Sequence, residues 1–249
     1  MDPISLFKQT KFSNTVWWKL KTKVKGFQNE FGDNLVTEIF DKRIFRIVEK
    51  DLFLKDWAYK SRILVQLYED GYLCWINIDE LICEKLLNKN EKKIVCDTSY
   101  IQSQIPSVMQ WIKDQSMLTN KYLWGGTVGP DYDCSGLIQT AFWKHNIFLP
   151  RDSYQMKNFC SKVINFPGNI NLLRTGDIIF FGNESRCNHV AIYFKEGYYY
   201  HSSGKEYGRN GIGLDNLFDD NNLISSHYKS NLLSAGRIIR SYKWDKTLR

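Results

Sequence analysis

The strongest constraint on the fold of this chain is a change of pattern near its middle. Before about residue 85 the sequence is rich in short strand signals, whereas after about residue 105 helical spacing and a glycine-rich loop precede further strand signals. The stretch between them is polar, most of all at residues 88–93, and polar runs between patterned segments are typical of connections. The sequence therefore predicts two domains, residues 1–85 and 105–249, joined by a linker at residues 86–104.

The first domain is predicted to be a small β-barrel. Polar and apolar residues alternate over residues 18–24, and residues 43–48 are rich in β-forming side chains. Residues 63–68 and 72–78 flank a short turn that ends at Gly71, an arrangement typical of a β-hairpin. Several short strands in so short a segment favour a small barrel.

The second domain is predicted to be of the α+β class, because helices followed by an antiparallel sheet define that class. A helix is expected at about residues 106–118, with a proline in its first turn. A second helix is expected after the glycine-rich stretch 122–130, where four apolar residues recur at helical spacing: Leu137, Ile138, Ala141 and Phe142. Strands are expected at residues 177–181, 189–194, 198–201 and 237–241.

The composition argues against several function classes. The 249 residues are 43% apolar and 24% charged, as in ordinary globular proteins. The net charge of +7 is scattered, and no zinc-finger spacing, RNA-binding motif or phosphate loop is present, so no nucleic-acid partner and no metal are predicted. No run approaches the roughly 20 apolar residues of a membrane span. The six cysteines form no CxxC pair, which favours free thiols and a reducing compartment.

Three side chains are candidates for catalysis. Cys134 follows the glycine-rich loop at the apparent start of a helix, where the partial positive charge of the helix N-terminus is expected to lower the thiol pKa and favour a nucleophilic thiolate. His189 begins one expected strand and His201 ends the next. Adjacent antiparallel strands can bring two side chains together, so that one histidine orients the ring of the other.

Four segments together resemble the NlpC-type cell-wall cysteine peptidases: Asp133-Cys134-Ser135-Gly136, residues 176–181, residues 189–193 and Tyr200-His201-Ser202. The resemblance covers roughly residues 105–242. It implies a papain-like core in which a helix packs on an antiparallel sheet. It also implies that Cys134 is the nucleophile, His189 the general base and acid, and His201 the orienting group, with no metal or organic cofactor.

A closer resemblance, at residues 122–134 and 201–213, is to the subgroup with an N-terminal bacterial SH3-like barrel, the γ-D-glutamyl-L-diamino acid endopeptidases, including cyanobacterial ones. It implies cleavage after D-Glu in peptidoglycan stem peptides, L-Ala-γ-D-Glu-diamino acid, that carry a free N-terminal L-Ala. Asp133 would pair with that ammonium group. The resemblance assigns substrate contacts to seven residues: Tyr122, Asp133, Ser135, Asp152, Ser153, Glu69 and Asp70.

Other functions stay open at this point. One is a non-catalytic peptidoglycan-binding protein, and another is an amidase or acyltransferase that uses the same Cys–His pair. The sequence does not choose between diaminopimelate and lysine as the diamino acid, and it gives no oligomeric state. The start of the chain lacks the pattern of an export signal. A cytoplasmic protein of cell-wall recycling is therefore predicted, and a wall-facing location stays open.

Overall fold

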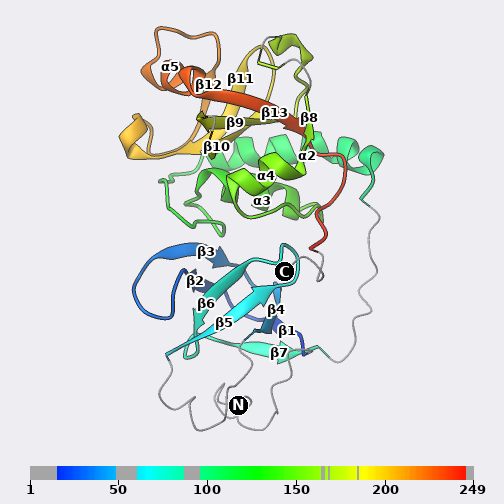
Figure 1. The fold of residues 1–249 in the computed structure, drawn as a ribbon, viewed down its shortest axis with the longest axis vertical. Coiled ribbons are helices and arrows are strands. Elements are labelled where there is room, and N and C mark those ends of the chain that lie inside the picture. The colour runs from blue at the N-terminus through cyan, green and yellow to red at the C-terminus, as the bar shows by residue number, and fades with distance from the viewer. Residues whose placement is uncertain are drawn as a thin grey trace. The chain divides into compact units, whose positions relative to one another are not determined.

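The computed structural model describes residues 16–48, 61–86, 96–163, 166–167, 169–183 and 185–244 (Figure 1). The chain divides into two units, one formed by Met1–Lys93 with Lys243–Arg249 and the other by Ile94–Tyr242. Each unit buries apolar residues of its own.

The described part of the first unit is an antiparallel sheet of seven strands, in the order β3-β2-β6-β5-β4-β1-β7. The core between its strands includes Trp18, Phe45 and Ile63, all fully buried. The strands are β1 (Trp18–Leu20), β2 (Val24–Phe27), β3 (Leu35–Ile39), β4 (Ile44–Ile47), β5 (Arg62–Leu67), β6 (Leu73–Asn77) and β7 (Cys83–Lys85).

The expected hairpin in the first unit is confirmed, since β5 and β6 pair antiparallel with Val65 opposite Cys74. The alternating segment at residues 18–24 does not form a single strand. The chain bends after Leu20, where the N–H of Lys21 bonds to the carbonyl of Ile82. The segment therefore forms two strands with different neighbours, β1 beside β4 and β7, and β2 beside β3 and β6.

The second unit is α+β, as predicted. Its described residues form α-helices, short 3-10 helices and a six-stranded antiparallel sheet. The sheet order is β12-β11-β10-β9-β13-β8. Its helices are α2 (Thr98–Ser116), α3 (Cys134–Trp143), α4 (Ser153–Phe159) and α5 (Leu223–Ser230), with short 3-10 turns at Ile170–Leu172 and Lys205–Tyr207. Its strands are β8 (Ser161–Lys162), β9 (Ile178–Asn183), β10 (Arg186–Tyr193), β11 (Tyr198–Ser203), β12 (Gly211–Asn216) and β13 (Leu232–Arg237).

Helix α2 begins earlier than the sequence predicts. Asp97 caps it by accepting a hydrogen bond from the N–H of Tyr100, so the helix starts at Thr98 and Pro106 lies inside it. Residues 98–104, expected to be linker, are helical for this reason. The last expected strand is also displaced, since β13 ends at Arg237 instead of beginning there.

Helix α3 is the buried helix of the second unit. Nine of its ten residues are buried, and its apolar side chains share one core cluster with Val190, Ile192 and Tyr200 from β10 and β11. Its polar side chains are buried as well, so the helix lies inside the fold. Burial on every side fixes the position of its N-terminus, and Cys134 stands there.

Candidate active site

Asp133 and Cys134 together start helix α3. Oδ1 of Asp133 accepts a hydrogen bond of 2.6 Å from the N–H of Gly136, the interaction that makes aspartate a favourable N-cap residue. Gly136 leaves no room for a side chain, because a Cβ there would collide with the carbonyl oxygen of Gly126. The sequence Asp-Cys-Ser-Gly therefore begins the helix at the cysteine and lets the glycine-rich loop pass against it.

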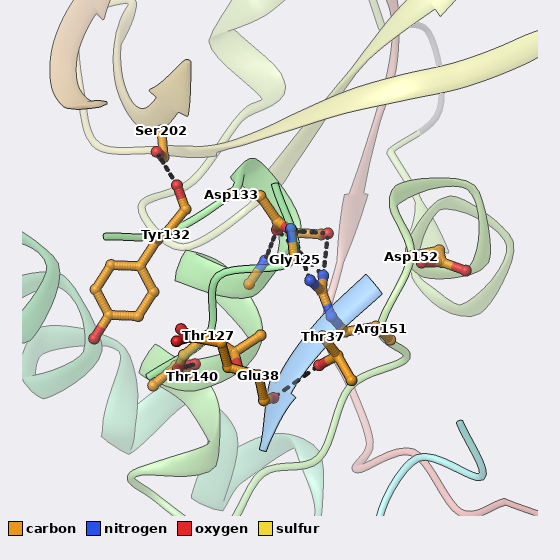
Figure 2. Close-up of polar contacts among 12 residues, drawn as sticks. Thr37, Glu38, Gly125, Thr127, Tyr132, Asp133, Thr140, Arg151, Asp152 and Ser202 are labelled. Carbon is orange, nitrogen blue, oxygen red and sulfur yellow. Dashed lines mark hydrogen bonds and ion pairs between the residues drawn. The ribbon is translucent and has the colours of Figure 1, made fainter. Parts of the chain in front are cut away.

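The Asp133 carboxylate is the centre of a buried polar cluster (Figure 2). Besides capping α3, it accepts a hydrogen bond of 2.9 Å from the N–H of Gly125 and binds both terminal nitrogens of Arg151. Ser135 joins the cluster, since its Oγ lies 3.2 Å from Asp133 Oδ1 and accepts a hydrogen bond of 2.9 Å from Arg151. The carboxylate thus already has several protein partners. Its contact with a substrate ammonium stays a prediction.

His189 on β10 and His201 on β11 meet directly. Nε2 of His189 lies 2.8 Å from Nδ1 of His201. The two strands pair antiparallel with Ile192 opposite Tyr200, which brings the histidine positions to neighbouring places on one face of the sheet. The pairing of the two histidines that adjacent strands were expected to allow is therefore present.

Two contacts connect the start of α3 with the histidine strands. The backbone N–H groups of Val190 and Ser135 face the Cys134 sulfur, and Val190 directly follows His189 on β10. The hydroxyl of Ser202, next to His201, donates a hydrogen bond of 2.6 Å to the carbonyl of Tyr132 (Figure 2). The start of α3, where Cys134 stands, therefore lies against the two strands that carry His189 and His201.

The expected lowering of the Cys134 pKa is not found. Burial is the largest effect, and together with the Asp133 carboxylate it raises the pKa of Cys134 to about 12, against the lowering effect of Val190, Arg151 and Ser135. Loss of hydration outweighs the favourable field of the helix end. In the resting site the sulfur is therefore a thiol.

Both histidines are uncharged in the resting site. Burial holds the pKa of His189 well below its ordinary value, and the neighbouring His201 and His227 lower it further. Burial also lowers the pKa of His201, more than the hydrogen bond and charge of Asp215 raise it. A neutral imidazole can accept a proton, so either ring is in the form that a general base requires.

The remaining residues expected to contact substrate in the second unit lie at different places. Burial raises the pKa of Tyr122, and the charges of Cys134 and Asp133 raise it further. Asp152 is the N-cap of α4 and forms a capping box with Gln155, to one side of the Asp133 cluster in Figure 2. Ser153 donates a hydrogen bond of 3.2 Å to the carbonyl of Cys187.

Glu69 and Asp70, also expected to contact substrate, are buried in the first unit. Both carboxylates bind Arg43, at 2.8 Å and 2.9 Å, and Glu69 also accepts a hydrogen bond from the N–H of Ile44. Their side chains are 8% and 2% exposed. The arrangement gives them a structural function inside the sheet, and their contact with substrate stays a prediction.

Three residues around the histidines were missed by the sequence analysis: Asp215, Arg209 and Tyr228. Asp215 accepts a hydrogen bond of 2.7 Å from Nε2 of His201 and binds Arg209 through both carboxylate oxygens. Tyr228 on α5 stacks on the His189 ring with centroids 4.4 Å apart. Of the three, only Asp215 could have been suspected from the sequence, because it lies in the strand-like run 211–216. Placing it beside His201 required the register of β11 and β12.

Two further searches cover the described residues. In that part of the chain no three or more His, Cys, Asp or Glu side chains are grouped so as to hold a metal ion. No described helix has the length and apolar character needed to cross a bilayer.

The chain resembles several known proteins over part of its length. It is 36% identical over 89 residues to a gamma-D-glutamyl-L-lysine dipeptidyl-peptidase of Bacillus cereus, covering 34% of this chain and 25% of that protein. It is 32% identical over 122 residues to the bifunctional muramidase/DL-endopeptidase CwlT of Bacillus subtilis, covering 47% and 32%. The crystal structure of an NlpC/P60 family protein from Bacillus cereus aligns with 91% of this chain and 64% of that one, at 20% identity and a TM-score of 0.45.

The family match falls on the second unit. The model of the NlpC/P60 family matches residues 119–235, a range that contains Cys134, His189 and His201. The chain spans only 25% and 32% of the lengths of the two curated relatives described above, so the match concerns a domain. Residues 119–235 of this chain form an NlpC/P60 family domain.

Proposed function

We propose that the chain is a cysteine endopeptidase that hydrolyses the γ-D-glutamyl–diamino acid bond of peptidoglycan stem peptides with a free N-terminal L-Ala. The observation that supports it most is that a buried cysteine, at the start of a helix, lies against the strands that carry a hydrogen-bonded pair of histidines. The names of the two similar Bacillus proteins, a gamma-D-glutamyl-L-lysine dipeptidyl-peptidase and a DL-endopeptidase, support the bond type.

In the proposed mechanism, His189 takes the Cys134 thiol proton as sulfur attacks the γ-carbonyl carbon of D-Glu. Nε2 of His189 is bound to His201, so Nδ1 is the nitrogen that accepts this proton. Backbone N–H groups at the start of α3 would stabilise the oxyanion. The C–N bond then breaks, the diamino-acid amine leaves with the proton from His189, and water hydrolyses the thioester with the same histidine as base.

The test of this function is product analysis with free stem tripeptide as substrate. Cys134→Ala is expected to abolish release of the diamino acid while the far-UV spectrum and melting temperature persist. Cys160→Ala, at the cysteine that follows α4 as its C-cap, is the matched control and is expected to stay active. Full activity of Cys134→Ala would refute the assignment, and products cut at another bond would indicate an amidase or acyltransferase.

A second experiment tests recognition of the free amine. Acetylation of the substrate N-terminus is expected to reduce cleavage strongly if Asp133, despite its partner Arg151, also binds that ammonium. Equal cleavage of the blocked peptide would remove the amine-reading role from Asp133 and leave it as the cap of α3.

Three finer features belong to the same proposal. The first unit would be an SH3-like barrel that helps to bind the substrate, and the second unit would have the papain-like arrangement of helix on sheet. The six cysteines form no CxxC pair in the sequence, and with that pattern we propose a place in a reducing compartment and a role in recycling wall fragments. Cell fractionation, with the protein found in the wall fraction, would contradict that placement.

A further inference from the structure

The two histidines and Asp215 are linked in series by hydrogen bonds. His189, His201 and Asp215 lie on three adjacent strands, β10, β11 and β12. His201 stands opposite Gly213 in the register of β11 and β12, and Asp215 is two residues further along the same face. His201 is fully buried and Asp215 nearly so, so solvent does not compete for these hydrogen bonds.

Each of these hydrogen bonds, from His189 to His201 and from His201 to Asp215, has a definite donor and acceptor. Burial opposes ionisation of Asp215, but His201 and Arg209 together hold its pKa below the ordinary value, so the carboxylate only accepts hydrogen bonds. Nε2 of His201, 2.7 Å away, must therefore carry a hydrogen. Neutral His201 then has a bare Nδ1, which must accept from Nε2–H of His189 at 2.8 Å. In neutral His189 the bare nitrogen is consequently Nδ1.

We propose that Asp215, held by Arg209, is a positioning residue for catalysis: it fixes the tautomer of His201, and through it that of His189, so that Nδ1 of His189 is kept bare for the Cys134 proton. This inference rests on the proposed function, since it assigns a direction to the base of that reaction. The tautomer of His189 is thus set by the carboxylate of Asp215, which contacts His201 and acts on His189 through it.

Arg209 and Gly213 hold the carboxylate in place. The guanidinium of Arg209 binds both oxygens of Asp215, a fork that fixes the plane of the carboxylate. That guanidinium lies directly over Gly213, where a Cβ would collide with three of its atoms. The absence of a side chain at Gly213 in β12 thus lets Arg209 reach Asp215. Gly213→Ala is expected to remove the contact between Arg209 and Asp215 without changing any polar side chain.

The first test reads the tautomers in the resting protein. The chain has four histidines, so 15N-histidine labelling gives few resonances, and these are assigned by single substitution of each histidine by glutamine. At pH 7.5 we expect Nε2–H and bare Nδ1 for both His189 and His201. A hydrogen on Nδ1 of either ring would overturn the proposal. Because this measurement needs no turnover, it stands or falls separately from the peptidase function.

The second test compares kinetics of variants on the stem tripeptide. Asp215→Asn puts a donor where both neighbours donate, and we expect kcat to fall about 10–100-fold with little change in KM, less than the loss seen when the orienting acid of a serine-protease triad is replaced. Asp220→Asn, at an exposed ion pair with Lys229, is the control and should keep kcat. An unchanged kcat in Asp215→Asn would overturn the proposal.

A third comparison keeps the proposal testable where Asp215→Asn folds poorly. Gly213→Ala should lower kcat several-fold and shift the His201 Nε2–H resonance, measured at a temperature where the variant is folded. Arg209→Lys should retain more activity than Arg209→Gln, because lysine restores the charge but not the fork. Wild-type kcat and spectra in Gly213→Ala, with the protein folded, would count against the positioning role.

Discussion

Arg151 places its guanidinium against the carboxylate of Asp133, the residue immediately before the candidate nucleophile. Both side chains are almost fully buried, at 3% and 8% exposed. The pair connects the loop that leads into α4 with the N-terminus of α3, and the same carboxylate caps the helix. The position of Cys134 therefore depends on a residue 17 positions later in the chain.

Loss of this ion pair should be costly. Arg151→Met is expected to lower the free energy of unfolding of the second unit by about 3–5 kcal/mol, because it leaves the Asp133 charge buried without its cation. Urea denaturation followed by near-UV circular dichroism measures this difference. Lys229→Met is the control, since its partner Asp220 is exposed, and it should cost at most about 1 kcal/mol. Equal effects of the two substitutions would contradict a structural function for the buried pair.

The parts of the site that the sequence predicts are those with a local signal. The start of α3 follows from a glycine-rich loop and apolar spacing, both within residues 122–142, whereas its cap by Asp133 was not predicted. The strands that carry His189 and His201 follow from runs of β-forming residues. The sequence did not establish that the two histidines are in contact, because which strands are neighbours in a sheet is a tertiary property.

The parts that the sequence does not predict depend on register or on burial. Asp215 reaches His201 because Gly213 stands opposite His201 in the register, and Arg151 binds Asp133 from 18 positions later in the chain. The raised pKa of Cys134 depends on how deeply α3 is buried, which periodicity alone does not give. The early start of α2 is a local case in which the cap at Asp97 outweighed the preference of Pro106 for a first turn.

The ionisation of Cys134 gives a test with a clear sign. Burial and Asp133 raise its pKa to about 12, so the rate of its alkylation by iodoacetamide should keep rising above pH 9. In the urea-unfolded chain the same rate should level off near the ordinary thiol pKa of 9.0. Mass spectrometry of the peptide that contains Cys134 measures both rates. A folded-state plateau below pH 7 would instead indicate a thiolate–imidazolium pair.

Stability of the second unit should fall on mild acidification. The folded pKa values of His189 and His201 lie below the ordinary 6.5, so below about pH 6.5 the unfolded chain binds more protons than the folded one. The free energy of unfolding is then lost as the pH falls, by up to about 1.4 kcal/mol per pH unit for each proton. Urea denaturation from pH 7.5 to 5.5 measures the slope. His189→Gln should be less steep, and a flat wild-type profile would exclude buried neutral histidines.

Glu69 offers a test of the first unit that separates a structural from a substrate-binding function. Its carboxylate lies between Arg43 Nε and the N–H of Ile44, so Glu69→Gln weakens a hydrogen bond to a buried cation. We expect a loss of about 1.5–3 kcal/mol in unfolding free energy and a KM within twofold of wild type at a temperature where both proteins are folded. Asp33→Asn, at a fully exposed carboxylate 3.8 Å from Arg62, is the control and should change neither quantity. A raised KM with unchanged stability would instead establish Glu69 as a substrate contact, because a side chain that only binds ligand leaves the folding equilibrium of the ligand-free protein untouched.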